Sequence, residues 1–323
     1  MNDKKVSVVI PVYNSAKWMD ELVGRIHMEL DDLVSHEIIL VNDGSPDRDV
    51  WPKIEEICKR DSRVEGIDLL YNSGQFTATM CGLEYATGDY IITMDDDLQH
   101  PPEELHKLIE CIDEKEYDCV FGVYGAAKEN FFRRAGSQLT NGIVGKLYNR
   151  PKGIRSNSFR IMTNNLAKTI AMYKTCKPQI SPLIFMCTKN IGNVLVEHKP
   201  RVYGKSGYTL KKLISATFNS VVNISTFPLD IISAVGIFSS CLAFLIALVY
   251  LVRYFLGEIL VPGFTAQILV TVFFGGLILL GLGIVGKYIG RIISEITGLP
   301  RYVVRKILNG EDKDEKNIDI RNG

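Results

Sequence analysis

Two carboxylates that stand one residue apart are the most informative chemical feature of this 323-residue chain. Asp95 and Asp97 follow an apolar run at residues 90–94, and alternate residues at a strand end point the same way, so both side chains can face one site. Converging carboxylates repel each other unless a divalent cation lies between them, and Mg²⁺ and Mn²⁺ prefer such oxygen ligands. An acidic turn that caps the helix beginning near Pro102 would use the same residues, so this cluster alone leaves both interpretations open.

Polar residues also follow two further apolar runs, and helical patterns separate the runs. Residues 6–12 precede Tyr13 and Asn14, residues 38–41 precede Asn42 and Asp43, and a fourth apolar run covers residues 119–123. Helix-like stretches occupy residues 16–32, 51–61, 77–86 and 102–114. Strands that alternate with helices predict an α/β fold with a mostly parallel sheet, whose ligands bind beyond the carboxyl ends of the strands. Turn formation explains an Asn or Asp at one strand end, but it does not explain such residues at three strand ends, so we expect these polar residues to form one site.

Composition and missing motifs exclude several classes of protein. The chain has 37 Lys and Arg against 37 Asp and Glu, and this neutral balance gives no support for nucleic-acid binding. Seven cysteines without a CxxC pair favour reduced thiols over a disulfide framework or a zinc site. The sequence has no GxxxxGK[ST] loop, no GxGxxG after its first apolar run and no GxSxG elbow, which disfavours P-loop phosphotransferases, dinucleotide enzymes and serine hydrolases.

The apolar residues of the chain are concentrated in two uncharged segments, residues 231–252 and 266–286. Each is close to the roughly 20 residues that cross a bilayer, and a pair of buried core helices of this length is the less favoured interpretation. Basic residues flank the pair on one side, and the linker 253–265 carries only one Arg and one Glu, so the positive-inside rule predicts that both termini are cytoplasmic. Residues 208–227 show helix-like apolar spacing and predict an amphipathic helix on the membrane surface, with an ordinary surface helix as the alternative.

The expected organisation therefore has four parts. Residues 1–207 form a cytoplasmic α/β domain, and residues 208–228 the amphipathic juxtamembrane helix. Residues 229–290 contain the two transmembrane helices, and residues 291–323 a cytoplasmic juxtamembrane segment and charged tail, which we expect to be disordered beyond residue 310.

Three motifs, taken in order, resemble the family-2 glycosyltransferases with the GT-A (Rossmann-like) fold. They are VVIPVYN at residues 8–14, VNDGS at 41–45 and DDDLQHPPE at 95–103. The last motif is similar to the polyprenyl-phosphate branch, which contains dolichol-phosphate mannose synthases, bactoprenol glucosyltransferases and undecaprenyl-phosphate aminoarabinose transferases. The NSGQ segment at 72–75 and the two C-terminal spans also resemble that branch, so the resemblance covers nearly the whole chain.

This resemblance implies roles for the matching residues. The nucleotide-sugar site would comprise Pro11, Tyr13, Asn14, Asp43, Gly74, Gln75, Asp95 and Gln99. Asp95 and Asp97 would hold Mg²⁺ or Mn²⁺ on the diphosphate, with Asp97 counted among the catalytic residues. The lipid phosphate would be bound by Arg133, Arg134, Ser137, Arg160, Arg201 and Lys205, of which Arg133 and Arg201 would also be catalytic. Arginine suits phosphate because its planar guanidinium forms paired hydrogen bonds, although a solvated surface position is the alternative for each Arg alone.

The resemblance further implies an inverting transfer from a nucleotide sugar, with UDP favoured, to undecaprenyl or another polyprenyl phosphate at the cytoplasmic leaflet of a bacterial inner membrane. The product would be a lipid-linked sugar donor for modification of cell-envelope glycans. A lipid phosphate is already an anion, so the reaction needs no general base, which agrees with Ser158 standing where several relatives carry an Asp. The expected partners are the nucleotide sugar, the lipid, the membrane and further copies of the chain in a homo-oligomer, with a tetramer among the forms it could take. A saccharide acceptor and a non-catalytic membrane scaffold are the alternatives, although the QxxRW motif of processive synthases is absent.

Overall fold

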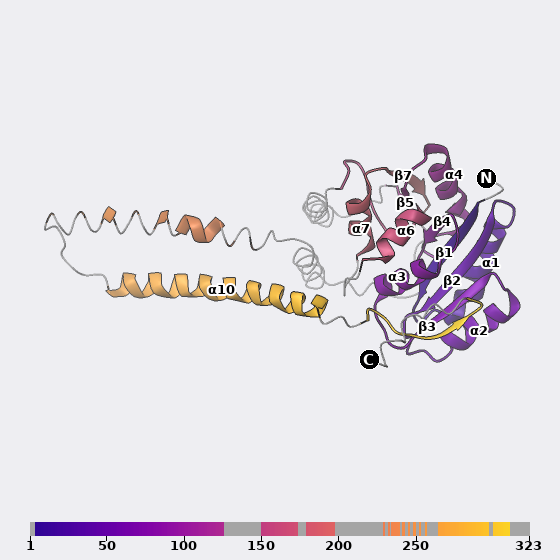
Figure 1. Ribbon diagram of the computed structural model, residues 1–323, viewed down its shortest axis with the longest axis horizontal. Helices are drawn as coiled ribbons and strands as arrows, with labels where there is room; N and C mark the ends of the chain where they lie inside the picture. The colour runs from indigo at the N-terminus through magenta and orange to yellow at the C-terminus, as the bar shows by residue number, and fades with distance from the viewer. Residues whose placement is uncertain are drawn as a thin grey trace, which may run out of the picture. The chain divides into compact units, whose positions relative to one another are not determined.

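The computed structural model (Figure 1) describes residues 4–125, 150–173, 179–197, 264–296 and 300–310, together with separate positions between 229 and 256. The chain divides into two compact units, residues 1–206 with 299–323 and residues 207–298.

The first unit is built on one eight-stranded sheet with the strand order β7-β5-β6-β4-β1-β2-β3-β8. The strands are β1 (Lys5–Val12), β2 (Ser35–Asn42), β3 (Val64–Leu69), β4 (Tyr90–Thr93), β5 (Cys119–Tyr124), β6 (Arg160–Thr163), β7 (Ile191–Val196) and β8 (Val304–Leu308). Strands β4, β1, β2 and β3 run parallel, as do β5 and β7, whereas β6 and β8 are antiparallel to their neighbours. The expected mostly parallel α/β sheet is therefore confirmed.

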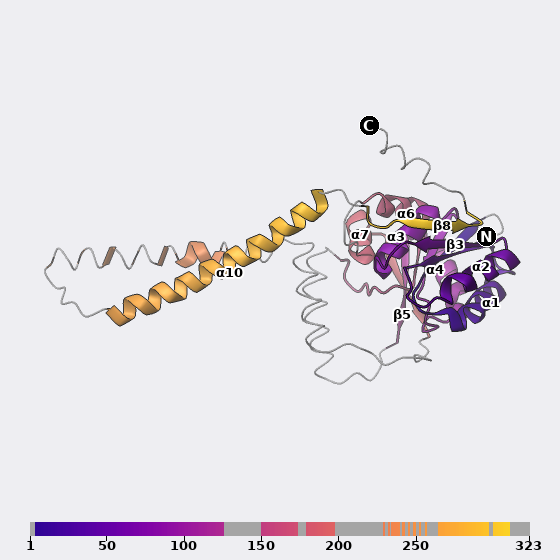
Figure 2. The same cartoon turned by 90° about the horizontal axis from the view of Figure 1, so that it is seen from below.

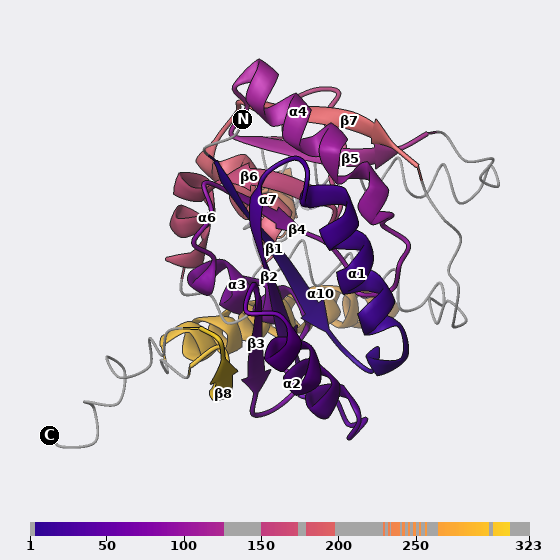
Figure 3. The ribbon, with the colours of Figure 1, turned by 90° about the vertical axis from the view of Figure 1, so that its right-hand side faces the viewer.

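The helices follow from apolar residues spaced along one face. They are α1 (Met19–Leu30), α2 (Val50–Arg60), α3 (Gln75–Tyr85), α4 (Leu105–Lys115), α6 (Asn164–Ala171) and α7 (Ile180–Cys187), with short 3₁₀ turns at Ala16–Trp18 and Pro102–Glu104. In α1, for example, Leu22, Ile26 and Leu30 are buried at i, i+4 and i+8, which places them on one face of a helix with 3.6 residues per turn. Helices α1, α2 and α4 cover one face of the central strands, and α3, α6 and α7 lie on the other (Figure 3). Two helical layers explain why β1 is buried along nearly its whole length.

The sheet gains its last edge strand from the C-terminal part of the chain. Strand β8 pairs with β3 in the antiparallel direction and covers the edge that β3 would otherwise expose (Figure 2). Sequence analysis assigned no structure to this segment, because five residues with two charged side chains give too weak a strand pattern.

The second unit contains α10 (Phe264–Ile296), a continuous helix of 33 residues. In the described part of the chain, no helix is both long enough and apolar enough to cross a membrane. The two spans expected at 231–252 and 266–286 therefore stay a prediction, and the amphipathic helix expected at 208–227 lies outside the described residues.

Candidate active site

Three loops meet at the carboxyl ends of β1, β2 and β4, which are adjacent strands of the sheet. Their contacts are direct: the Tyr13 N–H donates to Asp96 Oδ2 at 2.9 Å, and the Asn14 N–H donates to Ser45 Oγ at 3.2 Å. Strand β1 can carry Pro11 here because its pairing with β4 ends at Val9, so position 11 needs no N–H on that side. Parallel strands thus bring together segments that are about 80 residues apart, as the sequence predicted.

Asp95 is held in place through both of its carboxylate oxygens. Gln75 Nε2 donates to Oδ1, and Ser158 Oγ donates to Oδ2 at 2.7 Å. The backbone N–H of Asp95 donates to Nδ1 of His100, whose buried ring stacks on Phe159 with a 5.1 Å centroid separation. Of these partners, only Gln75 was expected in the nucleotide-sugar site; Ser158 was noted only as standing where several relatives carry an Asp. Ser158 and His100 give no sequence signal of their own, because their role depends on contacts made in three dimensions.

The middle acid of the triplet has a different role. Asp96 Oδ2 accepts the Tyr13 N–H, and its backbone carbonyl accepts the indole N–H of Trp18, so this residue joins the β4 loop to the β1 loop. Burial raises the pKa of Asp96 to about 6, and the neighbouring Asp95 and Asp97 add to that effect. This role agrees with strand alternation, in which the residue between Asp95 and Asp97 points to the other side.

Asp97 lies partly exposed beside this framework, with Oδ1 accepting the Gln99 N–H at 3.1 Å. The donor set of Asp95 and Asp97 fits a hard divalent cation, because it offers carboxylate oxygens at a partly exposed strand end and no soft ligand.

Asp43 anchors the loop that begins α3. Its buried carboxylate accepts the backbone N–H groups of Ser73 at 2.7 Å and Gly74 at 2.9 Å. Burial raises the pKa of Asp43, and these two N–H donors oppose the shift because they stabilise the anion. The loop also approaches Gly44 so closely that a Cβ there would lie 2.4 Å from Asn72 N, which explains the glycine in the second motif. Asp43 thus shapes the loop that delivers Gln75 to Asp95.

Arg160 is enclosed by protein atoms. Its side chain is 2% exposed, Nε donates to Thr93 Oγ1 at 3.0 Å, and Nη1 donates to Ser181 Oγ at 2.9 Å. Burial lowers the pKa of Arg160 to about 10. Thr93 in turn donates to the Ser158 carbonyl, so in this structure Arg160 supports the strand end that carries Ser158 and Asp95. Its contact with a lipid phosphate stays a prediction. Five other predicted phosphate ligands, Arg133, Arg134, Ser137, Arg201 and Lys205, lie outside the described residues.

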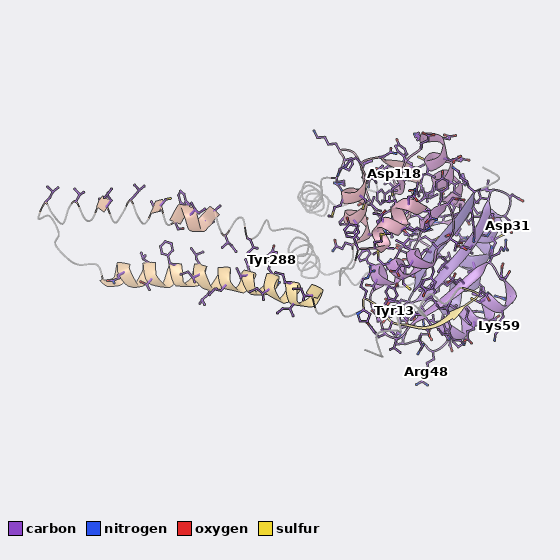
Figure 4. All side chains as sticks on the ribbon, viewed as in Figure 1. Tyr13, Asp31, Arg48, Lys59, Asp118 and Tyr288 are labelled. Carbon is purple, nitrogen blue, oxygen red and sulfur yellow. The ribbon has the colours of Figure 1, made fainter. Side chains whose placement is uncertain are left out.

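A second group of metal-ligand side chains lies at the opposite ends of the strands. One ligand atom from each of His27, Asp31 and His36 falls within 4.8 Å of the others. Nδ1 of His27 lies 2.7 Å from Nε2 of His36, and Arg63 forms an ion pair with Asp31 at 2.6 Å. His36 is in register with the second residue of β1, whereas Tyr13 follows its last residue, and Figure 4 labels Tyr13 and Asp31 at these two ends. This group is therefore separate from Asp95 and Asp97, about 20 Å away along the strands at 3.3 Å per residue.

The mostly parallel sheet, with a carboxylate pair at its strand ends, is of the GT-A type. A family model for glycosyl transferase family 2 matches residues 7–175, and the chain belongs to that family. It is 33% identical over 318 residues to an undecaprenyl-phosphate 4-deoxy-4-formamido-L-arabinose transferase of Edwardsiella ictaluri, with 96% of each protein covered. Glucosyl-3-phosphoglycerate synthase from Mycobacterium tuberculosis, solved with Mn²⁺, UDP and phosphoglyceric acid, matches in fold with a TM-score of 0.50 at 16% identity, over 68% of this chain and 77% of that one. The family predicted from the three motifs is confirmed.

Proposed function

We propose that the protein transfers a sugar from a nucleotide sugar, with UDP favoured, to undecaprenyl phosphate at the cytoplasmic leaflet of a bacterial inner membrane, with inversion at the anomeric carbon. The observation that carries the proposal is the end-to-end similarity to an undecaprenyl-phosphate sugar transferase, together with the carboxylate pair of Asp95 and Asp97 at a joined strand edge. The UDP preference is supported by the UDP in the solved structure of similar fold.

The proposed chemistry depends on position and charge rather than on a base. The lipid phosphate is an anion at neutral pH and attacks the anomeric carbon directly, while the nucleoside diphosphate leaves from the opposite side. Mg²⁺ or Mn²⁺, held by Asp95 and Asp97, would supply positive charge at the diphosphate. Gln75 and Ser158 fix Asp95 from two sides, so its orientation is set before the donor binds, which is the condition for catalysis by preorganised charge.

The acceptor side of the proposal uses Arg133, Arg134, Ser137, Arg201 and Lys205 as ligands of the lipid phosphate. The support is their sequence context in two loops that resemble acceptor loops of the polyprenyl-phosphate branch, the second of which precedes the amphipathic segment 208–227. Arg160 would act on this side only after a rearrangement that frees its guanidinium from Thr93 and Ser181.

The membrane anchor of the proposal consists of residues 231–252 and 266–286. Neither segment has a charged residue, and α10 contains the whole of the second segment in one continuous helix. Large apolar side chains of α10 are exposed, among them Leu279 at 70% and Leu282 at 62%, which favours a lipid or protein neighbour over water. The second segment carries the small residues Gly275, Gly276, Gly281 and Gly283, which allow close helix packing. A Cβ at Gly281 would lie 3.5 Å from Ile232 Cγ2, which supports packing within the chain at that position. We propose that the other exposed apolar residues of α10 contact lipid and further copies of the chain in a homo-oligomer.

The test is a panel of sugar nucleotides incubated with the detergent-purified full chain, undecaprenyl phosphate and Mn²⁺, with lipid-linked product read by mass spectrometry. UDP-glucose, UDP-4-deoxy-4-formamido-L-arabinose, a UDP-GlcNAc-type donor and GDP-mannose form the panel. The expected result is one lipid-linked sugar that disappears in Asp97→Ala. Transfer to a saccharide and not to the lipid would assign the alternative acceptor, and absence of any turnover or nucleotide binding would favour a scaffold.

A further inference from the structure

Strand β8, the C-terminal edge strand of the sheet, carries an arginine that contacts a buried carboxylate on the neighbouring strand β3. Arg305 donates from Nε to Oδ2 of Asp68 at 2.6 Å, and its Nη2 lies 2.5 Å from the same oxygen. The side chain of Asp68 is 1% exposed, whereas that of Arg305 is 53% exposed. A buried carboxylate on β3 thus receives its counter-charge from a residue 237 positions later in the chain.

The position of Arg305 follows from an irregularity in the strand pairing. Asp68 pairs with Lys306 and Leu69 with Val304, so Arg305 is an extra residue of β8 at a shift in register. A β-bulge of this kind re-aims a side chain relative to the regular pattern. The return segment is fixed on both sides of the bulge, since the Leu70 N–H donates to Val303 O at 2.8 Å and Asn309 Nδ2 donates to Val64 O at 2.9 Å.

From Asp68 an unbroken chain of hydrogen bonds leads to the loops at the active-site edge. Asn42 Nδ2 donates to Asp68 Oδ1 at 2.8 Å, and Ser45 Oγ donates to Asn42 Oδ1 at 2.6 Å. Ser45 Oγ then accepts the Asn14 N–H at 3.2 Å. The Asp68 carboxylate only accepts hydrogen bonds, so the Asn42 amide turns its NH₂ group towards Asp68 and its oxygen towards Ser45. Asp68 therefore determines the donor and the acceptor of each hydrogen bond in this series.

We propose that Arg305 is a positioning residue for the nucleotide site, which sets the Tyr13–Asn14 and Asp43–Ser45 loops through Asp68, Asn42 and Ser45. This inference rests on the proposed function, because it takes those loops to bind the nucleotide. It gives the segment after the second proposed span a role in the reaction, since only residues 297–303 separate α10 from β8. Without Arg305, the Asn42 amide is the one side-chain partner that the described residues leave to the Asp68 carboxylate, so we expect the amide and the loops that it holds to lose their fixed arrangement.

The test compares Arg305→Ala with Lys306→Ala in the full chain in detergent. Lys306 is the next residue of the same strand. Its backbone is in register with Asp68, but its side chain forms a surface ion pair with Glu55 at 2.6 Å. UDP binding in the presence of Mn²⁺ is measured by calorimetry, alongside the donor and lipid KM values and the melting temperature. We expect Arg305→Ala to weaken UDP binding about fivefold or more and to raise the donor KM while the lipid KM changes little; we expect Arg305→Lys to restore part of the affinity and Lys306→Ala to bind as the parent does.

A double variant separates positioning from mere loss of stability. If Arg305, Asp68, Asn42 and Ser45 act as one hydrogen-bond network, the double variant Arg305→Ala/Asn42→Ala should weaken UDP binding little more than either substitution alone. Unchanged UDP affinity in Arg305→Ala below its melting temperature, or additive effects in the double variant, would overturn the inference. Absence of binding of any nucleoside diphosphate in the parent protein would instead overturn the proposed function, so the two failures are distinguishable.

Discussion

The backbone N–H of Gly74 donates to Oδ2 of Asp43 at 2.9 Å, from a residue whose φ of 91° is in the region that favours glycine. The same glycine precedes α3, whose first residue, Gln75, holds Asp95. The backbone conformation of Gly74 therefore links Asp43, at the end of β2, to Asp95, at the end of β4.

Gly74→Ala tests this link. No atom lies within 4 Å of a Cβ at this position, so the substitution causes backbone strain without a clash. We expect either a loss of roughly 1–3 kcal/mol of stability or a shift of the loop that raises the donor KM. Melting temperature and donor KM are measured together. The matched control is Gly24→Ala in α1, which also has open space around its Cβ but carries no positive φ, and which should stabilise the helix by about 0.5–1 kcal/mol. Equal behaviour of the two variants would contradict the role of the Gly74 conformation.

Asp97→Ala should abolish transfer, and Asp95→Ala should come close to it. The loss of a metal contact at the leaving group should cost several kcal/mol of transition-state stabilisation, which is a fall in kcat of about a hundredfold or more. Turnover and Mn²⁺ affinity are measured for both, with Asp113→Asn as a carboxylate control that pairs with Lys4 on the surface. Full activity of the parent in excess EDTA would refute the metal role.

Arg133→Ala and Arg201→Ala should impair use of the lipid more than binding of the donor. Each substitution removes a charge-assisted hydrogen bond to phosphate of about 1.5–3 kcal/mol, or roughly 10- to 150-fold in apparent lipid affinity. Steady-state KM for undecaprenyl phosphate should be combined with single-turnover rates, because KM equals Kd only when chemistry is slow. A fall in UDP affinity at unchanged lipid KM would move these residues to the donor side.

The membrane proposal predicts that both termini are cytoplasmic and that only residues 253–265 reach the far side. Gly257→Cys in this linker should react with a membrane-impermeant maleimide added to intact cells, whereas Asn317→Cys in the tail should react only after lysis. The parent protein, with its seven cysteines, gives the background labelling. Labelling of the tail from outside would contradict the topology.

The sequence predicted the elements whose signal is local, and it missed those that depend on distant contacts. Strands β1, β2, β4 and β5 were predicted because they are apolar runs, and α1 because its apolar residues recur with a helical period. Strand β6 is as short as β4, but only two of its four residues are apolar, so it forms no apolar run that the sequence could mark.

The candidate site shows the same division between residues that the sequence marks locally and residues that only the fold brings together. Asp43, Asp95 and Asp97 stand at strand ends, which the sequence marks directly. The support of Asp95 by Ser158 and the counter-charge of Asp68 from Arg305 connect residues 63 and 237 positions apart, and no local pattern records such pairs. Chemistry-bearing residues at the strand ends were therefore recognisable, whereas the residues that position them required the fold.

The histidine pair at the other end of the sheet predicts a loss of stability in mild acid. Burial lowers the pKa of both His27 and His36, and the cation of Arg63 lowers both further, while Asp31 and Asp61 oppose the shift. A histidine whose folded pKa lies below its unfolded value of about 6.5 gives stability that is complete above pH 6.5 and is lost as the pH falls towards the folded pKa. His36→Gln removes one such group, so its melting temperature should fall less between pH 7 and pH 5 than that of the parent. Asp96, whose raised pKa acts in the opposite direction over this range, is present in both proteins and cancels in the comparison. An equal slope of melting temperature against pH in parent and variant would show that His36 does not titrate with unfolding.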